Sequence, residues 1–196
     1  MSALSCKKPG EECACLKRIA EGDRYAFDVL YRTYRRRVLH YLLCIVDDTA
    51  LAEELTNDVL IEVWKSARRF DDRSKPSTWI FGIARHKALN ALRRKHRVVK
   101  GLSEAMDKPD TTEGPETSAM RQCLGEKIER ALQALSRPHR EVIELAVYQG
   151  FSYAEIARVK ACSVNTVKTR MYYARRHLRQ ILEKMDITIE PFSPSL

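Results

Sequence analysis

The chain has 196 residues, of which 44% are apolar, and its formal net charge is +9. This length allows one or two domains, and almost no segment alternates apolar with polar residues as a strand does, so an all-α fold is expected. No run of about 18 apolar residues is present, so no helix is expected to span a membrane. A basic protein of this kind usually binds a polyanion, and nucleic acid is the first candidate.

The N-terminal segment, residues 1–16, has neither an apolar core nor a small-residue cleavage site, so no secretion signal and a cytoplasmic location are expected. The six cysteines of the chain should then be reduced thiols. Three of them, Cys6, Cys13 and Cys15, lie in this segment. A thiolate site for a metal or for redox chemistry is one interpretation, and a disordered tail with exposed thiols is the other. No fourth ligand is evident, so no metal centre is assigned.

Residues 17–45 predict a short helix, a break at Gly22-Asp23 with Asp23 as N-cap, and a longer helix whose apolar residues form its buried face. Arg35, Arg36 and Arg37 are expected on the solvated face. His40 has no partner evident in the sequence, which favours a structural role.

Residues 47–69 predict the next helix, which Asp47, Asp48 or Thr49 can cap. One side is apolar, and the other carries acidic and amide side chains: Glu53, Glu54, Asn57, Asp58 and Glu62. In a basic protein this acidic face is either a solvated helix surface or a docking face for a partner protein.

Residues 70–78 predict a loop, and residues 79–97 predict a helix that has six Lys and Arg and no acid. Aromatic residues flank its start: Phe70, Trp79 and Phe81. Cations beside aromatic rings suit single-stranded nucleic acid, although Trp79 also fits simple core packing. Residues 98–121 are rich in Pro, Gly, Ser, Thr and acids, which predicts a flexible linker between two domains.

Residues 122–183 predict a helical C-terminal domain, followed by a tail over 184–196. Ser136 is a candidate N-cap, and Gly150 a candidate C-cap. Ser152 and Glu155 have the spacing of a capping box. Two short helices then follow over residues 152–182, and the second has one apolar and one basic side. This is the pattern of a helix-turn-helix that places its second helix in the major groove.

The order of these segments resembles the sigma factors of bacterial RNA polymerase, namely the extracytoplasmic-function (ECF) group of the sigma-70 family. The resemblance covers roughly residues 20–183. Region 2.2 of that family resembles AEELTNDVLIEVWKSARRF, and regions 2.3 and 2.4 resemble STWIFGIARHKALNALRRKHR. Region 4 resembles LSRPHREVIELAVYQGFSYAEIARVKACSVNTVKTRMYYARRHL. The chain departs from the usual family residues at several positions: Asn57, Leu60, His86, Asn90, Ala161, Asn165 and Tyr173.

The resemblance implies an all-α chain of two helical domains, with region 2 at 17–97, a flexible linker at 98–121 and the helix-turn-helix of region 4 at 122–183. It implies three sets of site residues. Core polymerase would contact Glu53, Glu54, Asn57, Asp58, Leu60, Ile61 and Glu62. The opened −10 element would contact Lys75, Ser77, Trp79, Arg85, His86, Lys87, Asn90, Arg93 and Arg94. The duplex −35 element would contact Asn165, Thr166, Lys168, Thr169, Arg170, Tyr172, Tyr173, Arg175 and Arg176.

The resemblance also implies the partners: core RNA polymerase, promoter DNA and a controlling anti-sigma factor, for the transcription of stress or envelope-response genes. The sequence shows no recognisable nucleophile arrangement and no phosphate-binding glycine loop, so neither an enzyme activity nor a cofactor is expected. The alternative is a stand-alone helix-turn-helix regulator, which needs only residues 123–182.

Overall fold

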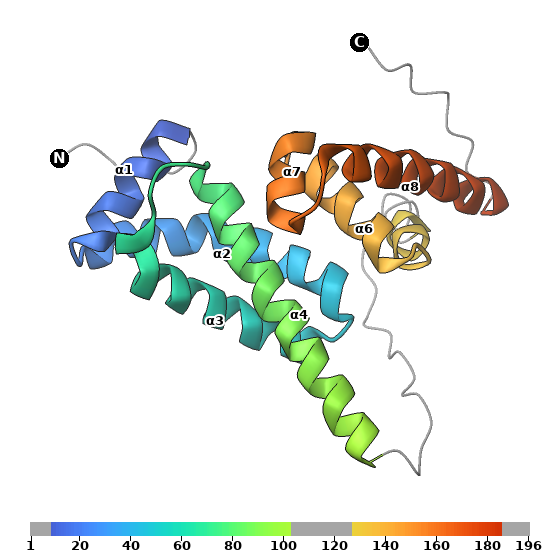
Figure 1. The fold of residues 1–196 in the computed structure, drawn as a ribbon, viewed down its shortest axis with the longest axis horizontal. Coiled ribbons are helices and arrows are strands. Elements are labelled where there is room, and N and C mark those ends of the chain that lie inside the picture. Colours follow the sequence, from blue (N-terminus) through green and yellow to red (C-terminus); the bar gives the residue numbers. More distant parts are fainter. Residues whose placement is uncertain (1–8, 103–126, 186–196) are drawn as a thin grey trace, which may run out of the picture.

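The computed structural model describes residues 9–102 and 127–185, and every regular element in these two ranges is helical (Figure 1). The N-terminal half contains the helices α1 (Pro9–Ala20), α2 (Arg24–Val46), α3 (Thr49–Ser66) and α4 (Pro76–Leu102), with a 3₁₀ turn η1 (Ala67–Arg69). The C-terminal half contains a helical segment over 127–133, then α6 (Arg137–Ile143), a π-helical turn η2 (Glu144–Tyr148), α7 (Tyr153–Lys160) and α8 (Val164–Lys184). The two-domain, all-α prediction is confirmed.

The N-terminal half is a packed bundle in which α2 contacts α1, α3 and α4. Its largest fully buried side chains include Tyr34, Tyr41 and Phe81. Asp23 caps α2, because its carboxylate accepts hydrogen bonds from the backbone N–H groups of Tyr25 and Ala26 at 2.9 and 3.1 Å. Asp48 caps α3 in the same way. The Asp23 cap was predicted from the sequence, and Asp48 was one of three candidates for the α3 cap, beside Asp47 and Thr49.

The first helix begins at Pro9, whereas the sequence predicted a tail up to residue 16. Cys15, Leu16 and Ile19 are buried against the bundle, and Tyr34 donates a hydrogen bond of 2.6 Å to Glu12 Oε1. These contacts explain the longer helix, since packing of an apolar face stabilises a helix more than local propensity does. Cys6 lies outside the described residues.

Helix α4 is longer at both ends than the predicted 79–97. It begins at Pro76, a residue that suits the first helical turn because it lacks an N–H. Ser77 and Thr78, placed in the loop by the sequence, therefore lie inside the helix and are buried. At its other end α4 continues to Leu102, so the first five residues of the predicted linker are helical. The rest of that linker, Cys123 and the C-terminal tail from residue 186 lie outside the described residues.

In the C-terminal half, α8 packs on α6 and α7 through Val167, Met171 and Ala174. The predicted capping box is confirmed: Ser152 Oγ accepts from Glu155 N–H at 3.3 Å, and the Glu155 carboxylate accepts from Ser152 N–H at 2.8 Å. Gly150 has φ +68°, as expected at a helix end.

The two halves pack directly on one another. Helix α6 contacts α2, and α7 contacts α4, while Figure 1 shows α8 leading away from α4. The rings of Phe81 and Phe151 meet across this boundary with centroids 5.2 Å apart. We call this contact between the N- and C-terminal halves the seam.

Candidate nucleic-acid interface

Helix α8 presents a broad polar and basic surface opposite its buried face. The predicted −35 residues all lie on this surface: Asn165, Lys168, Thr169, Tyr172, Tyr173, Arg175 and Arg176 are exposed, and Thr166 and Arg170 are partly exposed. Among the described residues, one cation of α8 forms an ion pair: Arg179 Nε lies 2.9 Å from Glu183 Oε1 in the same helix. The helix therefore offers several uncompensated positive charges to a polyanion.

The turn before α8 sets its direction. Ser163 caps the helix by accepting a hydrogen bond of 3.0 Å from Thr166 N–H. Ala161 has φ 48° and ψ 52°, the left-handed conformation that glycine adopts with less strain. A helix held at its N-terminus in this way can place its first turns against base edges in a major groove.

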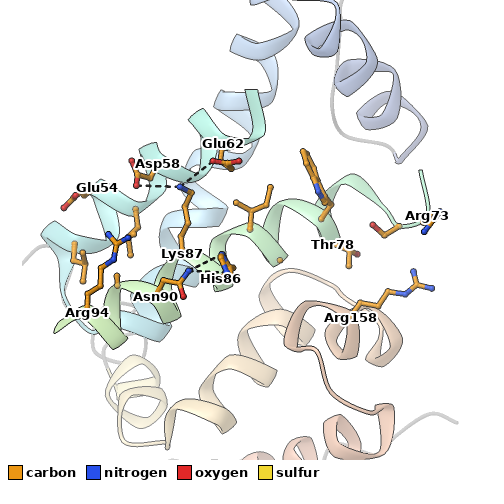
Figure 2. A pocket seen from close by; sticks show the side chains of 17 residues that line it. Glu54, Asp58, Glu62, Arg73, Thr78, His86, Lys87, Asn90, Arg94 and Arg158 are labelled. Atoms are coloured by element: carbon orange, nitrogen blue, oxygen red, sulfur yellow. Dashed lines mark hydrogen bonds and ion pairs between the residues drawn. The ribbon is translucent and has the colours of Figure 1, made fainter. Parts of the chain in front are cut away.

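A second basic surface lies in an open groove of about 1100 Å³ between α3 and α4 (Figure 2). Five of the predicted −10 residues line it: Trp79, His86, Lys87, Asn90 and Arg94. Two cations that the sequence did not single out also line it, Arg73 from the loop before α4 and Arg158 from α7. The groove therefore collects aromatic, amide and cationic groups, which suit an unpaired nucleic-acid strand.

The acidic face of α3 forms one wall of the same groove. Lys87 Nζ lies 3.8 Å from Asp58 Oδ2 and 3.9 Å from Glu62 Oε2 (Figure 2). These distances are long for an ion pair, and Asp58 is largely exposed. The side chains predicted to bind polymerase are thus neighbours of those predicted to bind DNA. Lys87, from the DNA-binding set, contacts Asp58 and Glu62 of the polymerase-binding set.

The rest of the predicted polymerase-binding set separates into exposed and buried residues. Glu53, Glu54 and Asn57 are exposed, as is Ile61 at 49%. Leu60 is different, because it is only 1% exposed and packs in the core. The described surface of α3 therefore offers Ile61 and the acids to a partner, but not the Leu60 side chain.

Of the remaining predicted −10 residues, Ser77 is buried, Arg93 is exposed, and Lys75 and Arg85 are turned to the seam. Lys75 Nζ lies 2.7 Å from Glu155 Oε1. Burial pushes the pKa of Glu155 upward, but hydrogen bonds from Lys75 and Ser152 outweigh it and leave the pKa below its ordinary value. In this arrangement Lys75 is a contact between the halves and not a free cation.

Glu141 of α6 is the centre of the seam. It is 4% exposed, and it accepts hydrogen bonds from Arg85 Nε at 3.2 Å and Tyr41 Oη at 3.3 Å. Lys160 Nζ also contacts the Glu141 carboxylate. Burial, followed by the charges of Arg85 and Arg170, lowers the pKa of Lys160 to about 7.

Further polar contacts cross the seam where the sequence predicted none. Arg37, expected on a solvated face, donates to Gln149 Oε1 at 3.0 Å and lies over the Tyr34 and Phe81 rings. His40, for which no partner was evident in the sequence, lies 3.0 Å from Glu144 Oε1 through Nδ1. One signal in the sequence was available: Glu141 and Glu144 lie among Val142, Ile143 and Leu145, and acids in an apolar helix face need partners.

Among the described residues, neither Cys13 nor Cys15 belongs to a group of three or more His, Cys, Asp or Glu side chains that could hold a metal ion. Cys15 is buried, and its Sγ donates to Ala26 O at 3.1 Å. Cys13 is partly exposed, and burial together with nearby Asp72 raises the pKa of its thiol. Among the described residues, no helix is long and apolar enough to cross a membrane.

Two family models match this chain. Sigma-70 region 2 matches residues 30–98, and Sigma-70 region 4 matches residues 125–178. The first match covers most of α2, all of α3 and most of α4, and the second covers α6, α7 and most of α8. The groove between α3 and α4 thus falls in one matched region, and the α8 surface in the other.

Curated relatives and solved structures agree with these matches. The chain is 30% identical over 181 residues to the ECF RNA polymerase sigma factor SigK of Mycobacterium tuberculosis, covering 87% of this chain and 92% of the relative. It is 31% identical over 161 residues to SigL of the same species, covering 81% and 90%. The sigma factor RpoE of Bartonella quintana, solved with the anti-sigma factor NepR, has the same fold with a TM-score of 0.68 at 24% identity, covering 80% of this chain and 96% of RpoE. CnrH, solved with the cytosolic domain of CnrY, aligns with a TM-score of 0.65 at 21% identity, covering 88% and 97%.

Proposed function

The chain belongs to the ECF group of RNA polymerase sigma factors, and we propose that it binds core RNA polymerase, recognises the −35 and −10 elements of its promoters and assists DNA opening. The observation that carries this proposal is the pair of surfaces on one chain: a free basic helix at α8 and a groove with acidic and basic walls between α3 and α4. The alternative of a stand-alone helix-turn-helix regulator leaves the groove and α1–α4 without a role.

For the −35 element, we propose that α8 enters the major groove of duplex DNA. Asn165, Thr169 and Arg170, near its start, would contact base edges. Lys168, Tyr172, Arg175 and Arg176 would contact phosphates, which position a protein without reading sequence. The outward orientation of these side chains supports this division, since Val167 and Met171 anchor the opposite face in the core.

For the −10 element, we propose that a displaced DNA strand follows the basic wall of the groove between α3 and α4. Flipping a base out of the stack costs a few kcal/mol, which pocket and phosphate contacts must offset. Trp79, His86 and Asn90 would contact bases, while Lys87 and Arg94 would contact phosphates. The location of all five residues in one open groove supports this assignment.

For core polymerase, we propose that the exposed acids of α3 form the docking face, with Glu53, Glu54 and Asp58 as polar contacts and Ile61 as an apolar contact. Charged interfaces contribute more to orientation and to association rate than to affinity. The polymerase supplies the chemistry, and the factor acts in the cytoplasm, where the bacterial polymerase works.

We also propose that an anti-sigma factor controls this chain. RpoE and CnrH, which share the fold, were each solved with a protein partner, NepR and the cytosolic domain of CnrY. Such a partner would act by stabilising an arrangement in which α4 and α8 cannot reach the promoter together. Co-purification of the chain with the products of neighbouring genes tests this part of the proposal.

The test of the main proposal is assembly with core polymerase. On gel filtration the chain should co-elute with core polymerase, and the complex should start transcription at a defined promoter. Asp58→Arg should weaken this assembly, because it reverses a charge on the docking face. Arg170→Ala is the matched control, since it should preserve assembly while weakening promoter selection. A chain that never co-elutes with core polymerase would refute the proposal.

A further inference from the structure

Three side chains of types that can bind a metal, two from α2 and one from η2, meet at the seam. His40 and Cys44 lie one turn apart on α2 and so share a helix face, and Glu144 comes from η2. The imidazole nitrogen, the thiol sulfur and the carboxylate oxygen all lie within 4.8 Å of one another. From this geometry we propose that His40, Cys44 and Glu144 bind a divalent transition-metal ion, best matched by zinc, which ties α2 to η2.

The distances are close to those of a tetrahedral site. Zn–N and Zn–O bonds of about 2.0–2.1 Å and a Zn–S bond of about 2.3 Å place the ligand atoms roughly 3.3–3.6 Å apart. His40 Nδ1 and Glu144 Oε1 are now 3.0 Å apart, so a small side-chain rotation would admit an ion between them.

The ligand types point to the ion. One imidazole, one thiolate and one carboxylate form a mixed nitrogen, sulfur and oxygen set, which suits zinc and disfavours the hard cations magnesium and calcium. The Cys44 thiol would release its proton to solvent on binding. Thiolate and carboxylate then carry two negative charges, which equal the charge of the ion, and a water molecule can complete the fourth position.

Neighbouring groups hold one ligand in place and leave another accessible. Glu144 is 2% exposed, and Gln149 Nε2 donates to its Oε1 at 2.9 Å. Arg37 in turn donates to Gln149. Hydrogen bonds of this kind orient metal ligands and are part of an effective site. The His40 side chain is about half exposed (51%), so an ion can reach the cluster from solvent.

The consequence follows from the position of the cluster. Two of the ligands belong to the N-terminal half and the third to the C-terminal half, so a bound ion would favour the packed arrangement of the halves. An ion that binds one conformation more tightly shifts the population toward it. Metal binding itself does not depend on the proposed function. Its expected effect on transcription does rest on that function: an ion that keeps the halves packed together should inhibit transcription.

The experiment uses the reduced full-length chain and cobalt(II) as a spectroscopic probe. Three cysteines outside the cluster are first changed to serine to remove competing thiols: Cys6, Cys13 and Cys123. One equivalent of cobalt should then give the visible bands of a tetrahedral site and a thiolate-to-cobalt charge-transfer band, and zinc should displace both. Cys44→Ser should abolish the charge-transfer band, and Glu144→Gln and His40→Gln should each weaken binding at least tenfold.

Cys162→Ser is the matched control, because Cys162 is a partly buried thiol in the turn between α7 and α8 and is not one of the three clustered ligands. It should bind cobalt like the parent, and circular dichroism of every variant checks that it is folded. A charge-transfer band that survives Cys44→Ser, or no band in the parent, would overturn the site and leave an ordinary His–Glu hydrogen bond.

A second measurement tests the link between the halves. Zinc should slow amide hydrogen exchange in both α2 and η2 of the parent, but not in Cys44→Ser. Protection of α2 alone would mean that the ion binds without joining the halves. The proposed link between α2 and η2 would then be refuted. Because this readout needs neither polymerase nor DNA, its failure is distinguishable from failure of the proposed function.

Discussion

The two basic helices α4 and α8 differ in what their cations touch. On α4, Arg85 faces Glu141, Lys87 faces Asp58 and Glu62, and Lys95 Nζ lies 3.4 Å from Asp48. Each of these carboxylates belongs to another part of the fold. On α8, the ion pair formed among described residues lies within the helix itself, between Arg179 and Glu183.

This difference shows that the two helices are not equally ready to bind nucleic acid. The cations of α8 can contact phosphates as they stand. On α4, Arg85, Lys87 and Lys95 must first leave carboxylates within the same chain, which costs little at the exposed pairs and more at buried Glu141. Lys75 and Arg85 of the predicted −10 set are thus paired with acids across the seam, while the predicted −35 side chains are exposed or partly exposed.

Removing the central acid of the seam should have the largest effect. Glu141→Ala leaves buried Lys160 and partly buried Arg85 without their anion. Truncating one partner of a buried charge pair weakens an interface by about 2–5 kcal/mol. Because Lys160 can lose its proton, we expect the lower part of this range. The measurement is the distance between spin labels on α2 and α8, which should lengthen and broaden.

Glu183→Ala is the matched control for this substitution. Glu183 is also an acid paired with an arginine, but it is exposed and lies within α8. It should leave the label distances unchanged. If Glu141→Ala also leaves them unchanged, the halves are held by Phe81 and Phe151 and not by the charges.

The next largest effect is expected on α8. Arg170→Ala should cost about 1–3 kcal/mol of affinity at one base position of a −35 duplex and relax the preference there. Fluorescence anisotropy with single-base variants of the duplex measures it. Arg175→Ala, as the comparison, should weaken all duplexes alike and lower the salt dependence by about one unit of slope. Equal losses on every duplex for Arg170→Ala would assign it to a phosphate.

Local sequence signals predicted much of this fold. The Ser152–Glu155 capping box, the Asp23 cap and the apolar side of α8 each depend on residues three or four apart, and all are present. The predicted −35 side chains share one surface for the same reason, because a helix period alone separates Val167 and Met171 from the polar positions.

Contacts between distant segments were not predictable in this way. Arg37, His40 and Arg85 found partners more than fifty residues away, and no spacing rule links residues in different domains. The start of α1 at Pro9 likewise depends on packing against α2 and not on its own sequence. The burial of Leu60, by contrast, was predictable, because Leu60 lies beside the apolar stripe of α3 in the sequence, and it is 1% exposed.

A smaller effect is expected at the turn that aims α8. Left-handed Ala161 carries about 1–2 kcal/mol of strain, and glycine loses about 0.4–1 kcal/mol more entropy on folding, so Ala161→Gly should stabilise by about 0.5–1 kcal/mol. Urea denaturation measures the change. Ala157→Gly, in the middle of α7, should instead destabilise by about 1 kcal/mol. A destabilised Ala161→Gly would mean that its methyl group is needed for packing.

The smallest effect on stability is expected at Lys87, where the comparison between the two helices is most direct. Lys87→Met keeps the aliphatic stem and removes the charge, and its long contacts with Asp58 and Glu62 should be worth less than about 1 kcal/mol in urea denaturation. The salt slope for binding of a single-stranded −10 segment by the polymerase complex should nevertheless fall by about 0.7, because one phosphate contact is lost. Arg179→Met, which also breaks an exposed pair, should leave that slope unchanged. A large loss of stability with an unchanged slope would show that Lys87 joins α3 to α4 and does not contact DNA. The phosphate contacts of the −10 strand would then be left to Arg94, with Arg93 and Arg73 as further candidates.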